Sequence, residues 1–287
     1  MRKGAKFYAY KKKGSDSMNV NEKSAAERVA LARSPKRPGT VDYIENLFED
    51  FMPLAGDRRK GEDESIISGI GFYHGKAVTV IGHRKGKNLE ENLRFRFGMP
   101  NPEGYRKAIR MMEQAEKFQR PVITFVDTPG AYPGIEAEAG GQGEAIASSI
   151  ATMSRLKVPT VSVFIGEGGS GGALAIGVGD RTIMLENSIF SILSPEGFAS
   201  ILWKDKDRWK EACDVMKLTA QDLKTYTICD TVIPEGEGGA NCNDTGVNSI
   251  YVKVDKAIKG ALDSLEKKSV EVLVRERYKK LRSIGRK

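Results

Sequence analysis

Two glycine-rich turns, residues 127–134 and 166–172, hold the residue types in this chain that could do chemistry. Each follows a short run of β-branched and aromatic residues, at 122–126 and at 160–165, so we expect each at the carboxyl end of a strand. In wound α/β sheets ligands bind at that edge, and glycine lets backbone N–H groups approach a ligand without a Cβ in the way. A helix expected at 171–176 opens from the second turn, and its free N–H groups could hold a phosphate or the oxyanion of an enolate.

The second turn also has the spacing of a dinucleotide-binding fingerprint. Gly166, Gly168 and Gly171 form a G-x-G-x-x-G pattern, and Glu186 follows after about 20 residues. That fingerprint needs a crossover helix that carries a pyrophosphate, and the helix expected here is short for this task. Tight backbone packing is the other interpretation of both turns.

Basic residues gather after His83, at the end of another expected strand. Arg84, Lys85 and Lys87 could contact the phosphates of a nucleotide-bearing substrate such as coenzyme A, and a solvated basic loop explains them equally well. His83 could serve as a general base, although a lone histidine at a strand end is more often structural. The serines near the turns have no base beside them, which disfavours acyl transfer by a serine nucleophile.

Composition excludes several classes of protein. The 287 residues are 40% hydrophobic, enough for a sizeable core, and no apolar run approaches the ~20 residues of a membrane span. Without a signal peptide pattern we expect a cytoplasmic protein. Three cysteines without C-x-x-C spacing and two histidines make no convincing zinc site, so no metal is expected in this chain.

The net charge of +8 is concentrated at the two ends. Residues 1–20 carry six Lys and Arg against one Asp, and residues 267–287 carry nine against two Glu, which leaves a body with a net charge of −4. We interpret both ends as solvated basic segments. The body has no cluster of aromatic and basic residues that would read single strands, so nucleic acid is an unlikely partner.

Strands and helices alternate along the chain, which indicates an α/β fold with parallel pairing. Order should begin at Ala25, after a capping box at Ser24, and a helix opening at Thr40 should carry apolar residues at helical spacing as far as Leu54. A hairpin should follow, with strands at 66–72 and 77–81. Further helices are expected at 104–118, 143–156, 195–203, 209–218, 220–226 and from Ile250 to Leu265, and further strands at 182–185, 189–193 and 231–233.

Three separated motifs closely resemble the carboxyltransferase α subunits of bacterial acetyl-CoA carboxylase. They read FVDTPGAYPG at 125–134, GEGGSGGALAIG at 166–177 and SPEGFASILW at 194–203. The resemblance implies a crotonase-like (ClpP/crotonase) superhelix of repeated strand-strand-helix units. It would form a domain at 25–266, between a flexible basic segment at 1–24 and a basic tail at 267–287.

The resemblance also implies a reaction and its partners. The family transfers a carboxyl group from carboxybiotin on a biotin carboxyl carrier protein to acetyl-CoA, giving malonyl-CoA, the first committed step of fatty acid synthesis. Its α chain works only with a β subunit, which carries a zinc ribbon, in an α2β2 assembly beside an ATP-binding biotin carboxylase. An apolar stretch around Phe198, Ile201, Leu202 and Trp203 is a candidate interface.

Site residues carried over from the family lie in the two turns. Backbone N–H groups of Gly171 and Gly172 would hold the oxyanion of the biotin ureido group, while biotin N1′ would act as the base. The cleft would be lined by Gly130, Ala131, Tyr132, Pro133, Gly134, Gly168, Gly169 and Ser170.

One departure from the family pattern follows the first turn. The family usually has two acidic residues before Arg-Gly-Gln, whereas this chain has Glu138-Ala139-Gly140-Gly141-Gln142. An ion pair of the family could therefore be absent. Two alternatives stay open at this point: another crotonase-fold acyl-CoA enzyme, such as a hydratase, isomerase or decarboxylase, and a carboxyltransferase for a different acyl-CoA.

Overall fold

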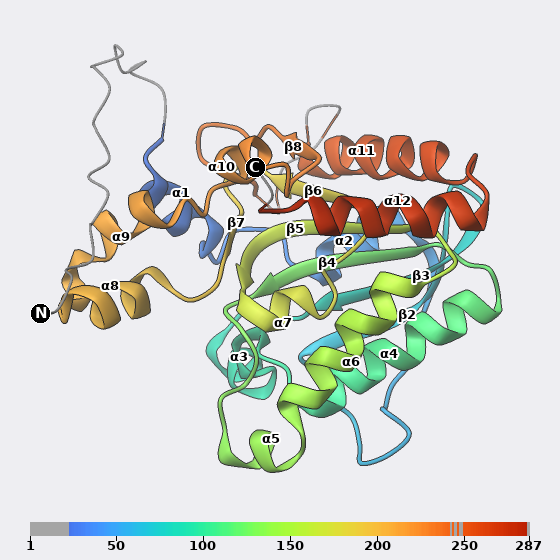
Figure 1. Ribbon diagram of the computed structural model, residues 1–287, viewed down its shortest axis with the longest axis horizontal. Helices are drawn as coiled ribbons and strands as arrows, with labels where there is room; N and C mark the ends of the chain where they lie inside the picture. Colours follow the sequence, from blue (N-terminus) through green and yellow to red (C-terminus); the bar gives the residue numbers. More distant parts are fainter. Residues whose placement is uncertain (1–22, 242, 244–245, 247–248, 286–287) are drawn as a thin grey trace, which may run out of the picture.

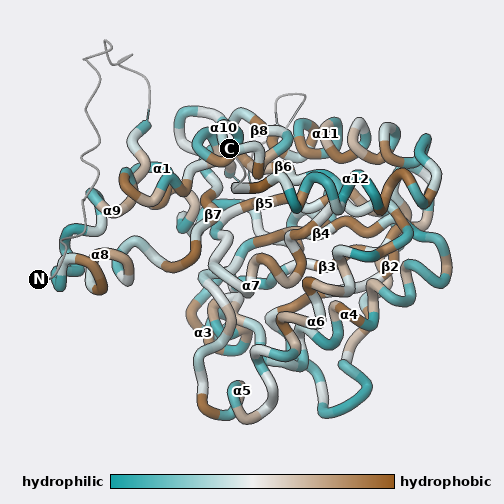
Figure 2. The backbone as a smooth tube through the Cα atoms, viewed as in Figure 1, coloured by the Kyte–Doolittle hydropathy of each residue, from teal (hydrophilic) through white to brown (hydrophobic). Residues whose placement is uncertain are grey.

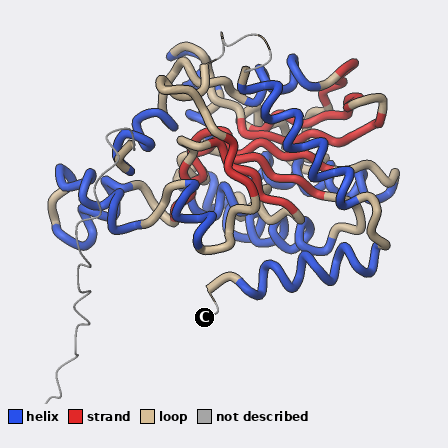
Figure 3. Tube along the Cα trace, turned by 90° about the horizontal axis from the view of Figure 1, so that it is seen from above, coloured by secondary structure: helices blue, strands red, loops and turns tan. Residues whose placement is uncertain are grey.

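The computed structural model describes residues 23–241, 243, 246 and 249–285. Most of the segment that the sequence predicts to be flexible and basic, residues 1–22, lies outside the described residues, as do parts of the glycine-rich loop after Gly236 and the last two residues. Within the described chain, helices cover both faces of one twisted sheet (Figure 1, Figure 3).

In the described part of the chain the sheet has eight strands, with the order β1-β2-β3-β4-β5-β6-β8 and β7 beside β5. The first two pairings are antiparallel and the others are parallel. Strand-strand-helix order occurs at β2-β3-α3, where α3 is Leu89–Arg94, and again at β6-β7-α8, where α8 is Pro195–Trp203. Single strands alternate with helices between them. The strands are β1 (Glu49–Pro53), β2 (Ile66–Tyr73), β3 (Lys76–His83), β4 (Val122–Thr128), β5 (Thr160–Gly169), β6 (Arg181–Leu185), β7 (Ile189–Ser191) and β8 (Thr231–Ile233).

Each face of the sheet packs on its own hydrophobic core. Helices α2 (Thr40–Leu47) and α11 (Ile250–Leu265) close one core, which includes Tyr43, Phe125 and Val254. Helices α4 (Pro102–Lys117) and α6 (Gln142–Arg155) close the other, which includes Met112 and Phe164. The central strands β4 and β5 are fully buried because helices cover both of their faces. In Figure 2 brown and white stretches follow the strands of the sheet, whereas teal is concentrated on the helices and loops around it.

The helices agree with most of the expected ranges within a few residues. They are α1 (Ala25–Ala32), α2 (Thr40–Leu47), α3 (Leu89–Arg94), α4 (Pro102–Lys117), α5 (Ile135–Ala139), α6 (Gln142–Arg155), α7 (Ser170–Leu174), α8 (Pro195–Trp203), α9 (Trp209–Met216), α10 (Ala220–Thr225), α11 (Ile250–Leu265) and α12 (Val270–Ser283). The capping box at Ser24 is confirmed, since its hydroxyl accepts from the backbone of Glu27 and the Glu27 carboxylate accepts from Ser24. The short helices α3 and α5 were not expected from the sequence.

The expected helix from Thr40 to Leu54 is wrong in its second half. Helix α2 ends at Leu47, and Phe48 is already extended. Residues 49–53 form β1 instead, which pairs with the edge of β2. Gly69 of β2 leaves room for Phe51, whose ring occupies the space that a Cβ at Gly69 would fill. Pairing with an open sheet edge therefore overrides the helical spacing of the apolar residues.

The expected solvated tail at 267–287 is also wrong for most of its length. Residues 270–283 form α12, which packs beside α6 and places Leu273 in the core. Arg277 is fully buried, and its guanidinium donates to both carboxylate oxygens of Asp180 at 2.7 Å. The basic character of this segment is thus partly structural.

Candidate active site

The two glycine-rich turns contact each other at the carboxyl ends of β4 and β5. A Cβ on Gly172 would lie 2.7 Å from the carbonyl carbon of Gly130 and 2.8 Å from the nitrogen of Ala131. A Cβ on Gly169 would lie 2.7 Å from the nitrogen of Gly130. Glycine is therefore required at both positions, because the backbone of one turn passes directly over the other. The structure therefore brings the two glycine-rich turns into one local cluster.

Helix α7 opens from this contact. Gly171 and Gly172 are its second and third residues, so their N–H groups have no carbonyl one turn earlier in the helix. Gly169 at the N-cap has no side chain that could accept from them, and Ser170 holds a left-handed φ of 49°. Gly171 is half-buried, Gly172 is buried, and Gly168 packs under the turn against Phe164. These N–H groups can stabilise a negative charge at the mouth of the turn.

The first turn is held in place on several sides. The Thr128 hydroxyl donates to the carbonyl of Gly130 at 2.7 Å and accepts from the N–H of Gly130 at 3.0 Å. The Gln142 amide donates to the carbonyl of Tyr132 at 3.0 Å and to the carbonyl of Pro100 at 2.8 Å. The Arg96 guanidinium lies 5.7 Å from the centre of the Tyr132 ring. Pro133 is exposed and Gly134 is the N-cap of α5.

A chain of alternating charges runs along the same edge of the sheet. The Lys85 amino group lies 2.7 Å from the Asp127 carboxylate and 3.0 Å from the Glu167 carboxylate. The Arg33 guanidinium joins Glu167 to Glu196, each at 2.7 Å, and Asp127 accepts from the N–H of Glu167 at 2.9 Å. We call Arg33, Lys85, Asp127, Glu167 and Glu196 the charge network. It joins the ends of β4 and β5 to α8.

Burial and charge act in opposite directions on the network. Burial lowers the pKa of Lys85, but Asp127 and Glu167 outweigh it, so the pKa of Lys85 is raised. Burial raises the pKa of Glu167, but Lys85 and Arg33 outweigh it, so the pKa of Glu167 is lowered. Each group is therefore held in its charged form near neutral pH.

The structure separates the three members of the basic cluster after β3. Lys85 belongs to the charge network. The Arg84 guanidinium stacks 4.1 Å from the centre of the Phe95 ring, and the Lys87 amino group lies 2.6 Å from Asp42. All three line a cavity of about 640 Å³ beside the turns, which Pro129 and Glu167 also line. Residues 130–134 and 168–172 lie outside the lining of this cavity.

His83 is buried directly behind the two turns. Its Nδ1 accepts from the N–H of Asp127 at 3.4 Å, and the backbone of Gly172 faces its ring. Burial, together with the charge of Lys85, lowers the pKa of His83 to about 3, so the ring is neutral near pH 7. Such a histidine supports the backbone, which agrees with the structural interpretation better than with a general base.

The acidic residues near the turns fall into two groups. Glu136, Glu138 and Glu144 are exposed on α5 and α6, whereas Glu167 and Glu196 belong to the charge network. No cluster of three or more His, Cys, Asp or Glu side chains that could hold a metal occurs among the described residues. In the same part of the chain, no helix is long and apolar enough to cross a membrane.

The unusual run at 138–142 links α5 to α6. Gly141 adopts a φ of 84° as the N-cap of α6, and the Arg106 guanidinium donates to the carbonyl of Gly140 at 3.1 Å. Arg106 also pairs with Asp57 at 2.8 Å. An arginine from α4 thus bonds to the backbone of this link. Sequence reasoning missed this contact, and it missed the roles of Arg33 and Asp127 in the charge network, because no motif brings these residues together.

Known proteins resemble the chain over most of its length. Residues 9–285 match the family described as acetyl co-enzyme A carboxylase carboxyltransferase-like. The chain is 53% identical over 269 residues to the acetyl-coenzyme A carboxylase carboxyl transferase subunit alpha of Clostridium acetobutylicum, covering 93% of this chain and 97% of that protein. It is 54% identical over 260 residues to a fused beta/alpha protein of Natranaerobius thermophilus, covering 91% of this chain and 42% of that protein.

Solved structures with little sequence identity share the fold. The transcarboxylase 12S core aligns with a TM-score of 0.66 at 17% identity, covering 85% of this chain, which spans about half the length of that one (45%). The geranyl-CoA carboxylase β subunit of Pseudomonas aeruginosa aligns with a TM-score of 0.62 at 14% identity, covering 92% of this chain and 48% of that one. The expected crotonase-like α/β fold is confirmed by these likenesses.

Proposed function

Because the chain belongs to the family of acetyl-CoA carboxylase carboxyltransferase α subunits, we propose that its two glycine turns form the carboxybiotin half of the transferase site. The contact of Gly172 with the Gly130–Ala131 peptide, at the opening of α7, is the observation that carries the proposal. It supports an assignment of the two N–H groups that open α7 as oxyanion donors at the edge of the sheet where ligands bind. The reaction is the transfer of a carboxyl group to acetyl-CoA.

The residues at the two turns are better suited to bind a ureido oxygen through backbone N–H groups than to act as general acids or bases. A Cβ at Gly172 would collide with the backbone of the other turn, so the close approach of the donors to that turn requires glycine. When bound, carboxybiotin would supply the carboxyl group, and its N1′ atom would supply the base for the proton of acetyl-CoA. The N–H groups of Gly171 and Gly172 then bind the ureido oxygen. Residues 130–134 and 168–170 would line the cleft around it.

The side chains behind the two turns keep these donors in place. Neutral His83 lies against the backbone of Gly172, and Lys85 ties the end of β4 to the end of β5. Because both groups are buried or paired, they position the backbone and do not exchange protons with substrate. Arg84 and Lys87, at the cavity beside the turns, are the proposed contacts for phosphates of coenzyme A, with Lys85 behind them.

A β subunit should complete the site. The fused beta/alpha protein of Natranaerobius thermophilus supports this partner, and so do the exposed apolar side chains of Ile192, Ile201 and Leu202 on and beside α8. The proposed assembly is α2β2, with the zinc ribbon and the enolate site on β. A biotin carboxyl carrier protein and an ATP-binding biotin carboxylase would supply carboxybiotin, and the proposed compartment is the cytoplasm.

Reconstitution tests this proposal. The full chain is mixed with the β subunit of its own host, carboxylated biotin carrier protein and acetyl-CoA, and malonyl-CoA is measured. We expect turnover on the order of 1 per second or faster from the mixture and none from either subunit alone. Turnover of an acyl-CoA by the isolated chain without biotin would instead establish a hydratase, isomerase or decarboxylase. A higher rate with another acyl-CoA would establish a carboxyltransferase of different specificity.

A further inference from the structure

A second cavity, of about 510 Å³, lies between α4 and α6 beside the loop at residues 55–61. It shares no lining residue with the cavity at the carboxyl ends of the strands. Five arginines line it, namely Arg58, Arg59, Arg106, Arg110 and Arg155. We propose that this arginine pocket binds a phosphate-bearing anion. The proposal does not depend on the chemistry at the glycine turns.

The carboxylates of the pocket do not neutralise its arginines. Asp57 is already engaged by Arg106 at 2.8 Å and by the backbone N–H groups of Arg59, Lys60 and Gly61 at 2.8–3.0 Å. The Arg106 guanidinium pairs with Asp57 and, at 3.2 Å, with Glu103, and it donates to the carbonyl of Gly140. Four arginines then face two other lining carboxylates, Glu113 and Glu144. The pocket therefore has a surplus of two positive charges.

Arg110 shows that this positive charge is built into the fold. Its guanidinium donates to the carbonyls of Gly56 and Ala55 at 3.0 Å and of Leu54 at 3.4 Å. No carboxylate of the described residues lies within ion-pair distance of it. Burial and the nearby charge of Arg58 both lower the pKa of Arg110. The guanidinium is thus oriented by neutral carbonyls, and an anion would relieve its repulsion with Arg58.

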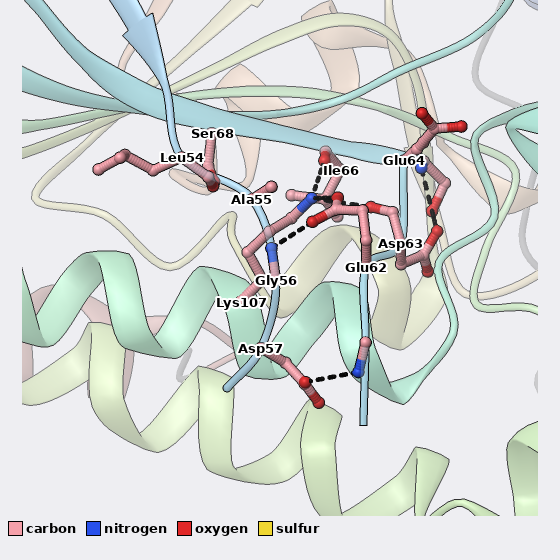
Figure 4. A network of polar contacts seen from close by, with 12 residues as sticks. Leu54, Ala55, Gly56, Asp57, Glu62, Asp63, Glu64, Ile66, Ser68 and Lys107 are labelled. Atoms are coloured by element: carbon pink, nitrogen blue, oxygen red, sulfur yellow. Dashed lines mark hydrogen bonds and ion pairs between the residues drawn. The ribbon is translucent and has the colours of Figure 1, made fainter. Parts of the chain in front are cut away.

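The loop that presents Arg58 and Arg59 is rigidly attached to α4. Lys107, only 2% exposed, reaches from α4 to the Glu62 carboxylate and to the carbonyls of Asp63 and Ile66 (Figure 4). The Glu62 carboxylate also accepts from the N–H of Gly56, and the N–H of Asp57 donates to the carbonyl of Gly61 at 2.9 Å. Because these bonds order the loop in advance, binding an anion costs little conformational entropy.

Phosphate groups match the pocket better than other anions. One guanidinium group can donate to two phosphate oxygens at once. The volume of the cavity is in the range of small-molecule sites. Among the described residues, no aromatic side chain lines the pocket, so they offer no surface on which a nucleobase could stack. A pyrophosphate unit could come from coenzyme A or from a separate phosphorylated metabolite.

Titration with inorganic pyrophosphate tests the proposal on the full chain. The double variant Arg58→Ala/Arg59→Ala removes two exposed arginines of the pocket, and Lys256→Ala/Lys259→Ala removes two exposed lysines of α11 as a control with the same charge change. By calorimetry we expect the first variant to weaken pyrophosphate binding at least about tenfold and the control to change it less than about twofold. Melting temperatures verify that both variants fold.

Two outcomes would overturn the proposal: absence of pyrophosphate binding to the wild-type chain at millimolar concentration, or equal weakening in both variants. The same titration with coenzyme A distinguishes the sources. If coenzyme A competes with pyrophosphate and loses affinity in Arg58→Ala/Arg59→Ala, it is the source. If coenzyme A does not compete and pyrophosphate still binds, the pocket takes a separate phosphorylated ligand.

Discussion

At the scale of single residues, Lys85 has a position that no other cation of the charge network shares. Its amino group contacts the carboxylates that end β4 and begin the second glycine turn. The side chains of Asp127 and Glu167 are about 90% buried, so loss of that charge would leave each with one counter-ion fewer in a poorly hydrated place. Arg33 also contacts Glu167, whereas Asp127 has no other cationic side chain within ion-pair distance among the described residues. Loss of Lys85 should therefore alter the end of β4 first.

Replacing Lys85 by Met should lower turnover in the reconstituted enzyme at least about tenfold, with a smaller change in KM, because the donors move but the acyl-CoA contacts stay. The free energy of unfolding should fall by about 3 kcal/mol, since two buried carboxylates lose a partner. The folded-state pKa of Glu167 is lowered in the wild type, so its stabilising effect is lost as pH falls through that pKa. In the variant this loss should begin at higher pH.

Lys85→Arg is the matched control, because it keeps the charge. Turnover against pH, together with thermal unfolding, checks the prediction. A Lys85→Met enzyme with wild-type turnover and an unchanged acid limb would show that Lys85 does not position the turns.

The two glycines of α7 should respond differently to alanine. A Cβ at Gly172 would meet the backbone of Gly130 and Ala131, which cannot move independently of the turn, whereas a Cβ at Gly171 would meet only the Ile146 side chain, at 3.3 Å. We expect Gly172→Ala to lose on the order of 10² in turnover by displacing an oxyanion donor, and Gly171→Ala to lose less than about tenfold. Equal activity of the two variants would argue against a role for this contact.

His83 should make stability depend on pH. Its folded-state pKa of about 3 lies below the unfolded value of 6.5, so only the unfolded chain takes up a proton in between. Stability should therefore fall by about 1.4 kcal/mol for each pH unit below 6.5 because of this residue. Denaturant unfolding at pH 7.0, 6.0 and 5.0 measures the slope, and His83→Asn should reduce it. An identical slope in the variant would mean that other groups cause it.

At the scale of elements, α12 depends on one buried arginine. The Arg277 guanidinium bonds Asp180 twice and donates to the carbonyls of Leu156 at 2.6 Å and Val158 at 3.0 Å. Asp180 in turn accepts from the N–H of Thr160, the first residue of β5. One side chain thus joins the last helix to the strand that carries the second glycine turn.

Arg277→Met should lower the free energy of unfolding by about 3 to 5 kcal/mol, because it leaves Asp180 buried without a counter-ion. Arg275→Met, at an exposed position of the same helix, should change it by less than about 0.5 kcal/mol. Hydrogen exchange should show that the amides of α12 lose protection in the first variant only. Retained protection there would mean that apolar contacts alone hold the helix.

At the scale of the whole molecule, α1, α8 and α9 form a lobe that projects from the sheet (Figure 1). Its small core consists of Val29, Ala32, Ile189, Cys213 and Leu218. The lobe also carries exposed Ile201 (62%) and Leu202 (58%). Glu196 of α8 is the member of the charge network that lies in this lobe, and it pairs with Arg33. A partner that covers α8 would therefore contact an element directly connected to the glycine turns.

Ile201→Asp/Leu202→Asp should weaken binding of the β subunit at least about tenfold without changing the melting temperature of the chain, because both side chains are already exposed. Val252→Asp, at an exposed apolar position of α11, is the control and should bind normally. Analytical ultracentrifugation of the mixed subunits measures the effect. Normal assembly of the double variant would place the β interface elsewhere.

Local sequence patterns were sufficient to predict much of the secondary structure of this molecule. The glycine turns, most helices and the hairpin could be predicted because turn chemistry, capping and apolar spacing act over a few residues, as at Ser24. The motifs also indicated the family, which the comparisons confirmed. The role of Gly171 and Gly172 stays a prediction.

Only the tertiary structure decided which distant groups meet. Residues 49–53 form a strand because they pair with the edge of β2. The basic end of the chain is held against the fold because Arg277 of α12 bonds Asp180, 97 residues earlier in the sequence. The sequence indicated that Lys85 is either a phosphate contact or a solvated cation, whereas in the fold it is paired with carboxylates 42 and 82 residues further on. A buried charge is costly unless it is paired with an opposite charge. The sheet decides which strand ends, and therefore which charged side chains, lie together, and a local sequence pattern carries no information about that.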